Sequence, residues 1–199
     1  MITGFNLSKD VWRWNANVNI ISVGCTVENN LIHGCHIGVE LAPGDSAKIN
    51  KNIISHVDTG IAMYGTKLSM ISHNIISTIL HTNNEYCIEM GGTGAGNTIM
   101  RNNLTHSYFG LSIYGAKQTI IKENNIANNK YGDFAYNRCS FFVKYRNNYW
   151  GGKTGPIVIQ GIIPIFYPKP FGHIGEFDIP YYRIDWHPAK EPYDIPGMR

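Results

Sequence analysis

Short stretches of alternating apolar and polar residues recur along this chain at a nearly constant interval. Each begins with an Asn that is followed at once by a hydrophobic residue, and the gaps between successive Asn are 22, 22, 29, 22 and 23 residues. A fixed period near 22 residues indicates a solenoid, in which every repeat forms one coil. The six steps are Asn30-Leu31, Asn52-Ile53, Asn74-Ile75, Asn103-Leu104, Asn125-Ile126 and Asn148-Tyr149.

Each coil is predicted to contain three short strands and three corners. One strand precedes the Asn, as in Ala47-Lys48-Ile49, and another follows it, as in Ile53-Ile54-Ser55. A third begins near Gly60, and no segment shows helical periodicity. Coils of about 22 residues with three strands, stacked in parallel, make an all-β parallel β-helix, here with about six coils.

The third strand fixes the register of the coils. It opens at Gly38, Gly60, Cys87, Gly110 and Gly132. Because strand side chains alternate between faces, the first and third positions after this residue are predicted to point inward. They hold Val39, Ile61, Ile88, Leu111 and Asp133, then Leu41, Met63, Met90, Ile113 and Ala135; Asp133 is the one polar exception. The predicted outward positions hold Glu40, Ala62, Glu89, Ser112 and Phe134, then Ala42, Tyr64, Gly91, Tyr114 and Tyr136.

The repeated Asn residues are predicted to occupy one corner of every coil. Asn tolerates left-handed backbone geometry, and its amide can bond to an Asn in the coil above and below. This column is therefore interpreted as a structural ladder rather than a ligand site.

Two segments depart from the repeat. Thirteen residues separate Asn74 from Cys87, against eight between Asn30 and Gly38, which predicts an inserted loop around residues 79–86. Such insertions lie on one face of a repeat protein, often the binding face. Eight of the nine prolines lie at or beyond Pro156, and Pro cannot continue the ladder. We therefore expect a β-helix over residues 1–150, with an incomplete N-terminal coil, and a Pro- and aromatic-rich C-terminal cap over residues 151–199.

Composition narrows the classes of partner. The net charge of +3 is small and no run of Lys or Arg is present, which argues against a nucleic-acid partner. No span approaches the ~20 apolar residues of a membrane-crossing helix, so no membrane insertion is expected. No signal peptide is visible at the start. A cytoplasmic protein and a segment of a longer secreted chain both remain open, and the missing N-terminal cap favours the second. The four cysteines are interpreted as free thiols, although a Cys25–Cys35 disulfide within one coil stays open.

The candidate catalytic residues lie at the outward positions, together with several of the candidate ligand-binding residues. Glu40 and Glu89 are predicted to lie two rungs apart, about 9.6 Å at ~4.8 Å per rung. This is close to the ~6.5–9.5 Å between the carboxylates of inverting glycosidases. Aromatic rings stack on sugar faces, and charged groups bond hydroxyls or uronate carboxylates. The candidate substrate-binding residues are Tyr64, Tyr114, Tyr136, Lys67 and Lys117, with Arg138 beyond them, and His81 and Glu85 in the inserted loop. An ordinary solvated sheet face, passive glycan binding and catalysis all remain open.

Metal and phosphate chemistry have weaker support. The pair His33-x-x-His36 could supply two metal ligands, but no third ligand lies at a convincing spacing. The glycine run at 91–96 follows a strand without opening a helix, so it is interpreted as a corner. We therefore expect neither a metal nor another cofactor.

Several motifs resemble those of the right-handed parallel β-helix repeat proteins, the broad class that includes pectate lyases and the periplasmic NosD-like proteins. They are Asn52-Ile53-Ile54-Ser55 with Gly60-Ile61, and Asn103-Leu104-Thr105 with Gly110-Leu111. Asn147-Asn148-Tyr149-Trp150-Gly151, followed by Gly155-Pro156, is similar to their closing motif. The tail from Ile184 to Ala189 is similar to tails of secreted surface members. The resemblance implies a right-handed helix and an extracellular, cell-surface or periplasmic location. The resemblance to NosD-like proteins implies copper as a candidate metal. No pectate lyase catalytic motif is found in the sequence.

These observations favour a secreted or surface β-helix that binds an extended polysaccharide on its outward strand face. The main alternative is a polysaccharide lyase, glycoside hydrolase or epimerase that uses Glu89, Glu40 and the tyrosines. The third is a structural surface-layer module or a NosD-like periplasmic accessory protein.

Overall fold

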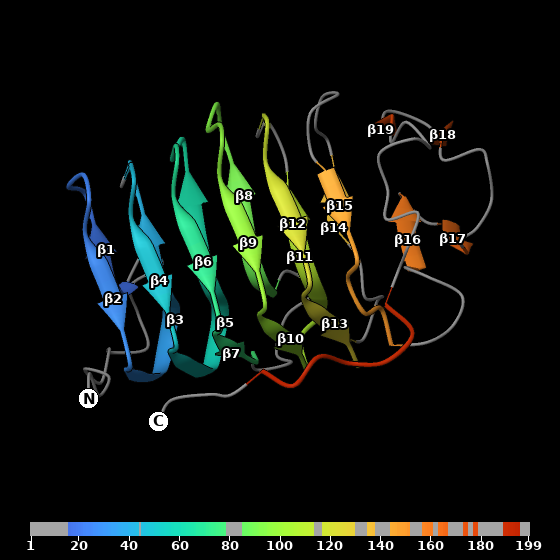
Figure 1. The fold of residues 1–199 in the computed structure, drawn as a ribbon, viewed down its shortest axis with the longest axis horizontal. Helices are drawn as coiled ribbons and strands as arrows, with labels where there is room; N and C mark the ends of the chain where they lie inside the picture. The colour runs from blue at the N-terminus through green and yellow to red at the C-terminus, as the bar shows by residue number, and fades with distance from the viewer. Residues whose placement is uncertain are drawn as a thin grey trace.

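Parallel strands, most of them only a few residues long, build the main body of the molecule (Figure 1). The computed structural model describes residues 16–43, 45–78, 85–113, 117–129, 135–137, 144–151, 157–160, 163–166, 173–174, 177–178 and 189–195. Over these residues the protein is all-β, and the parallel strands stack as a β-solenoid of about five turns with ~22-residue spacing. The predicted parallel β-helix is therefore confirmed. None of the described residues forms a helix long and apolar enough to cross a membrane.

Two sides of each coil belong to one nine-stranded sheet. In the first two complete coils a single long strand covers both sides, whereas the next coil is split where the insertion was predicted. As a result, β5 pairs in parallel with β3, β7 and β8. The strands are β1 (Ala16–Ile20), β3 (Leu31–Leu41), β5 (Ile53–Tyr64), β7 (Ile75–Ile76), β8 (Tyr86–Gly91), β10 (Asn103–Thr105), β11 (Phe109–Ile113), β13 (Asn125–Ala127) and β14 (Ala135–Asn137).

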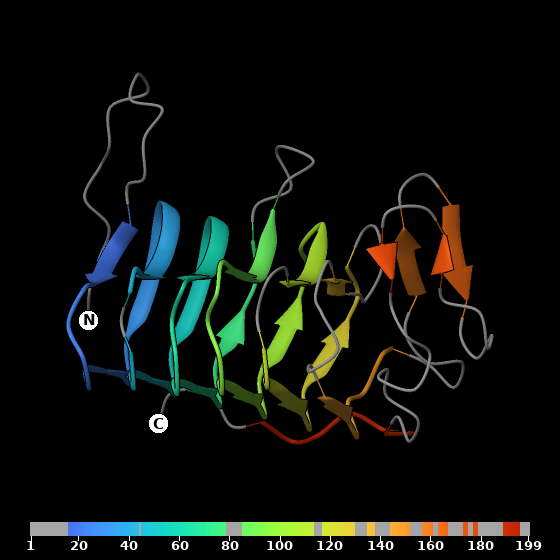
Figure 2. The same ribbon diagram turned by 90° about the horizontal axis from the view of Figure 1, so that it is seen from above.

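The third side of each coil belongs to a six-stranded parallel sheet, called sheet B here (Figure 2). Its order is β15-β12-β9-β6-β4-β2, so each strand pairs with its counterpart in the neighbouring coil. The strands are β2 (Thr26–Glu28), β4 (Lys48–Asn50), β6 (Met70–Ser72), β9 (Thr98–Met100), β12 (Ile120–Lys122) and β15 (Lys144–Arg146).

The inward columns form a continuous core along the solenoid. All eight apolar residues that the register placed inward between Val39 and Ile113 are at most 1% exposed. They pack with the central residues of sheet B, such as Ile49, Ile71 and Ile99. Each fully buried aliphatic side chain contributes about 1.5–3 kcal/mol relative to an exposed one. Asp133, the predicted exception, lies outside the described residues.

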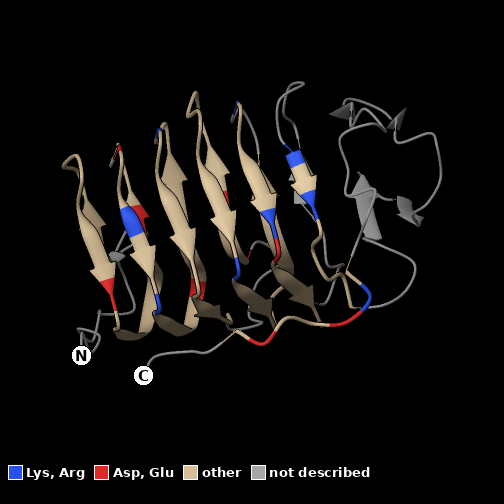
Figure 3. Cartoon of the chain, in the orientation of Figure 1, with Lys and Arg blue, Asp and Glu red and all other residues tan. Residues whose placement is uncertain are grey.

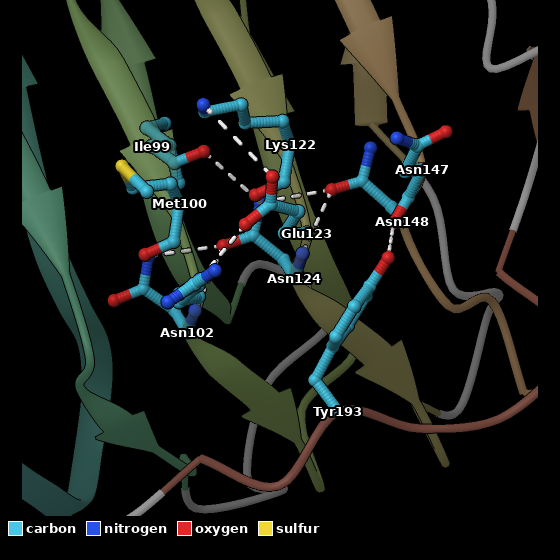
Figure 4. Close-up of polar contacts among 10 residues, drawn as sticks. Ile99, Met100, Asn102, Lys122, Glu123, Asn124, Asn147, Asn148 and Tyr193 are labelled. Carbon is cyan, nitrogen blue, oxygen red and sulfur yellow. Dashed lines mark hydrogen bonds and ion pairs between the residues drawn. The ribbon is translucent and has the colours of Figure 1, made fainter.

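The Asn ladder exists, but its register differs from the prediction in two coils. Each Asn donates its side-chain amide to the side-chain oxygen of the next, at 2.9–3.2 Å. In the fourth and fifth coils the members are Asn102 and Asn124, not Asn103 and Asn125. Asn103 instead opens β10 and pairs with Ile75. The members are Asn30, Asn52, Asn74, Asn102, Asn124 and Asn148. Figure 4 shows the last three.

At this corner the residue with left-handed backbone geometry is the one before each ladder Asn. The prediction had assigned that geometry to the Asn itself, and this is corrected here. Positive φ occurs at Asn29, Lys51, His73, Arg101, Glu123 and Asn147. This turn aims the following Asn inward, where it also donates to a main-chain carbonyl of the preceding coil, such as Ile49 or Ile71. The corner thus depends on an inward Asn preceded by a left-handed residue of variable type.

Beyond Gly151 the described segments leave the solenoid pattern. β16 (Ile157–Gln160) and β17 (Ile163–Phe166) form one antiparallel pair, and β18 (His173–Ile174) and β19 (Phe177–Asp178) form another. β16 contacts β14. Residues 189–195 then run back along the coils (Figures 1 and 2). The backbone of Tyr193 forms two 2.8 Å hydrogen bonds with the Asn125 side chain. The predicted cap over 151–199 remains a prediction, as does the packing of Trp186, which lies outside the described residues; Trp150 is buried in the core.

Candidate functional site

Pairing between coils brings Glu40 and Glu89 into one column. Glu40 pairs with Ala62, which pairs with Glu89, and Ser112 continues the column in the next coil. The two carboxylates are therefore two rungs apart, as the register predicted. These residues alternate with core side chains and are not members of the core cluster. We call the outer side of β3, β5, β8 and β11 around this column the Glu89 face.

The Glu89 face is not an open, solvated sheet. Glu40 is 6% exposed, Ser112 3% and Ala62 0%. Glu89 is only partly buried, so it is more accessible than Glu40, Ala62 and Ser112. Burial raises the pKa of both carboxyl groups because it disfavours their charged forms. Burial on this side of a strand could not be read from the alternation of the sequence alone.

Tyr64 reaches from one coil to the next to hold Glu89. Its hydroxyl donates to Glu89 Oε2 at 2.9 Å. This bond favours the carboxylate and partly offsets the burial that raises the pKa of Glu89. The sequence placed both residues on the outward side, and the structure joins them directly.

A His–Asp pair lies near the same carboxylate. His36 Nδ1 is 2.5 Å from Asp58 Oδ2, and the two residues are 22 positions apart, so they occupy the same place in adjacent coils. The hydrogen bond to Asp58 raises the pKa of His36 most strongly, and the charge of Glu89 adds to the effect. The sequence interpretation had grouped His36 with His33 and missed Asp58, although the 22-residue spacing would have identified this pair.

An aromatic pair flanks Glu89 along the same strands. The rings of Tyr86 in β8 and Phe109 in β11 are stacked, with centroids 5.5 Å apart and planes 22° apart. Both side chains are partly exposed. Sequence reasoning missed this pair because Tyr86 was counted with the inserted loop, whereas it opens β8 and pairs with Phe109.

The other predicted binding residues are not all gathered here. Lys67 and Lys117 are exposed at the corner that leads into sheet B. Glu85 was expected in a polar cluster of the inserted loop, but its side chain is fully buried, so it is not on the outer surface. Tyr114, His81, Arg138 and the side chain of Tyr136 lie outside the described residues.

The residues that could hold a metal are dispersed. Within the described part of the chain, no three His, Cys, Asp or Glu side chains lie together as a metal site would require. Cys25, Cys35 and Cys87 are free thiols. Burial raises the pKa of Cys87 to about 12, so this thiol stays protonated at neutral pH. His36 is engaged with Asp58.

Comparison with known proteins gives one match. The family model described as "Periplasmic copper-binding protein (NosD)" matches residues 7–154. No curated protein and no solved structure matches the chain. The family description names copper, and within the described residues no three His, Cys, Asp or Glu side chains lie together to hold it. The family's periplasmic location is consistent with the predicted periplasmic or extracellular one. Since the match covers well over half of the sequence, the chain belongs to the NosD family of right-handed parallel β-helix proteins.

Proposed function

We propose that the Glu89 face binds an extended, hydroxyl-rich polysaccharide. The observation that carries this proposal is the partly buried Glu89 carboxylate, fixed by Tyr64 in a column where Glu40, Ala62 and Ser112 are almost fully buried. A carboxylate held in this way accepts hydrogen bonds from sugar hydroxyls more strongly than an exposed one, because water competes less.

The neighbouring groups suit the same ligand. Tyr86 and Phe109 offer partly exposed ring faces on which a pyranose can stack. Asp58 and His36 add polar groups that lie one and two coils away from Glu89, respectively. Because the strands repeat every ~4.8 Å, these groups present a row of contacts to a chain that runs along the solenoid. Their carboxylates would repel an acidic sugar, so the face favours a neutral one.

Acid–base chemistry on the same face is the second candidate. Burial raises the pKa of both Glu40 and Glu89, and carboxyl groups with raised pKa values serve as general acids in glycoside hydrolysis. A lyase, hydrolase or epimerase would release or convert sugar units, whereas a binding protein would leave the polysaccharide intact.

The test is a binding assay with neutral polysaccharides of different linkages. Wild-type protein, Glu89→Gln and the control Glu191→Gln are compared by isothermal titration and by analysis of released sugars. Glu191 is an exposed carboxylate in the C-terminal segment, so its replacement removes the same charge elsewhere. We expect binding by the wild type and the control and a loss of about tenfold or more in Glu89→Gln, since hydrogen bonds to charged groups contribute about 1.5–3 kcal/mol.

Two results would overturn the proposal. Binding to none of the polysaccharides would favour a structural surface-layer module or an accessory protein without a glycan ligand. Equal binding by Glu89→Gln and the wild type would exclude this face. Release of sugar that disappears in Glu89→Gln would instead establish the enzymatic alternative.

A further inference from the structure

The left-handed corner beside the Asn ladder carries a line of basic side chains. Lys51, His73 and Arg101 occupy it in three successive coils. Main-chain hydrogen bonds keep them in register, from Lys51 N to the Ser72 carbonyl and from His73 N to the Met100 carbonyl. With the ladder Asn aimed into the core, Lys51 and Arg101 are exposed and His73 is partly exposed.

The line continues on the adjacent column of sheet B. Lys122 and Arg146 pair directly with each other on β12 and β15. Figure 3 shows basic residues on both strands. We call the whole line the corner stripe: Lys51, His73, Arg101, Lys122 and Arg146.

One carboxylate lies within the stripe, between two of the cations. Glu123 is 2.8 Å from Arg101 Nε and 3.9 Å from Lys122 Nζ. Figure 4 shows Lys122 and Glu123 beside the Asn ladder. Glu123 therefore holds two cations side by side in adjacent coils without neutralising both.

The pKa of His73 responds to the positive electrostatic potential along this line. Burial lowers the pKa of His73, and the charges of Arg101 and Lys51 on either side lower it further. Two flanking cations therefore act on a group between them, as expected for a continuous positive edge.

We propose that the corner stripe binds a linear acidic polysaccharide that runs parallel to the solenoid axis. It presents about one basic group per coil. Lys51 and Arg101, the cations on either side of His73, are two coils apart, about 9.6 Å along the axis, and Arg101, Lys122 and Arg146 follow one another at about 4.8 Å per coil. A regular polymer with one carboxylate or sulfate per sugar can meet several of them at once. This surface does not depend on the Glu89 face, because the β7/β10/β13 side of the coil lies between them in one direction and sheet B in the other.

The chemistry of the stripe favours a sugar polymer over other polyanions. No residue of its two columns is Phe, Tyr or Trp, the residues on which single-stranded nucleic acids stack their bases. Tyr193 meets the corner column at its end, where its hydroxyl donates to the Asn147 carbonyl. The main-chain groups of the corner are bonded to neighbouring coils, so an acidic peptide cannot add there as a strand.

The test measures affinity for polygalacturonate, alginate and a sulfated glycan as a function of salt. The comparison ligands in this test are fully methyl-esterified polygalacturonate, single-stranded oligo-dT and polyglutamate. The variant Lys51→Gln/Arg101→Gln is compared with the matched control Lys67→Gln/Lys117→Gln, which removes two exposed cations at the opposite edge of sheet B. Gln is tolerated in this backbone conformation, since Gln118 adopts φ 50° at another corner.

We expect salt-sensitive binding of at least one acidic polysaccharide and little binding of the methyl ester, oligo-dT or polyglutamate. The stripe variant should bind about 5- to 10-fold more weakly, as two exposed charge contacts predict, while the control should bind like the wild type. In NMR titrations, the bound polyanion should raise the pKa of His73. Glu89→Gln should retain this binding, which separates the outcome from that of the Glu89 face.

Four results would overturn the inference. They are no binding of any acidic polysaccharide, equal binding of the methyl ester, equal or tighter binding of oligo-dT or polyglutamate, and an equal loss in the control variant.

Discussion

The Asn-ladder corner and the Glu89 face both place polar side chains in stacked columns that are largely buried, yet they differ in how those side chains are used. Along the ladder the same residue recurs in every coil, and each amide bonds to the next Asn and to main-chain carbonyls. Along the Glu89 column the residue changes from coil to coil, from Glu40 to Ala62, Glu89 and Ser112. The carboxylates there have raised pKa values.

The difference shows which polar residues maintain the fold. A buried amide whose donors and acceptors are all met by the protein leaves little capacity for a ligand. A buried carboxylate with a raised pKa is instead held in a state that the fold does not favour, as is common at functional sites. Repetition along the solenoid therefore marks structure, and departure from repetition marks the candidate site.

The largest expected effect is on the ladder. Asn102→Ala removes the acceptor for the Asn74 backbone N–H and the donor to the Ile71 carbonyl. Each unsatisfied buried group costs about 1–3 kcal/mol, so the free energy of unfolding should fall by about 2–5 kcal/mol in urea denaturation. Asn30→Ala, at the partly exposed end of the ladder, should cost less than about 1 kcal/mol. Equal losses in the two variants would show that the ladder is not a cooperative internal column.

Tyr64→Phe should have an intermediate effect, confined to binding. It removes the hydroxyl that orients Glu89 and should weaken neutral-polysaccharide affinity about 3- to 10-fold, equivalent to ~0.5–1.5 kcal/mol. The pKa of Glu89 should rise further, because that bond favours the carboxylate. Titration calorimetry across pH measures both effects, with Tyr149→Phe as the control. An unchanged pH profile would contradict the role assigned to Tyr64.

The smallest effect is expected for Glu40→Gln. Burial raises the folded-state pKa of Glu40 above its unfolded value, so in the window between the two values the folded protein holds a proton that the unfolded chain has lost. Stability from this group is therefore present below the unfolded pKa and lost as pH rises through the folded pKa. Gln does not ionise, so the Tm of Glu40→Gln minus that of the wild type should increase from pH 4 to pH 7. A constant difference would mean that Glu40 is hydrated.

The fold could be predicted from the repeat because residues of the same type pack at the same positions in every coil. The inward column from Val39 to Leu111 was placed correctly by the residue that opens the third strand of each coil, a glycine in every one of these coils except at Cys87. The ladder was misplaced by one residue in two coils because Asn102 and Asn124 are each followed by a second Asn. The pattern of an Asn followed by an apolar residue therefore matched Asn103 and Asn125, which lie in strands, instead of the corner residues Asn102 and Asn124.

The candidate site could be predicted only in part. Register alone placed Glu40, Glu89 and Tyr64 on one side of the coil. Their burial could not be predicted, because alternation gives the side of a strand on which a residue lies and not its exposed fraction. The His36–Asp58 pair was within reach of the 22-residue period. So was the Tyr86–Phe109 stack, because these two residues directly precede Cys87 and Gly110, which the register aligns.

The most direct test of the central claim measures stability and binding together for Glu89→Gln at pH 7. If Glu89 belongs to a ligand site and not to the fold, the neutral side chain relieves the burial of a charge. The free energy of unfolding should then stay equal or rise, while neutral-polysaccharide affinity falls by about tenfold or more. A variant that is less stable and still binds like the wild type would contradict the account, because Glu89 would then stabilise the coil as the ladder does.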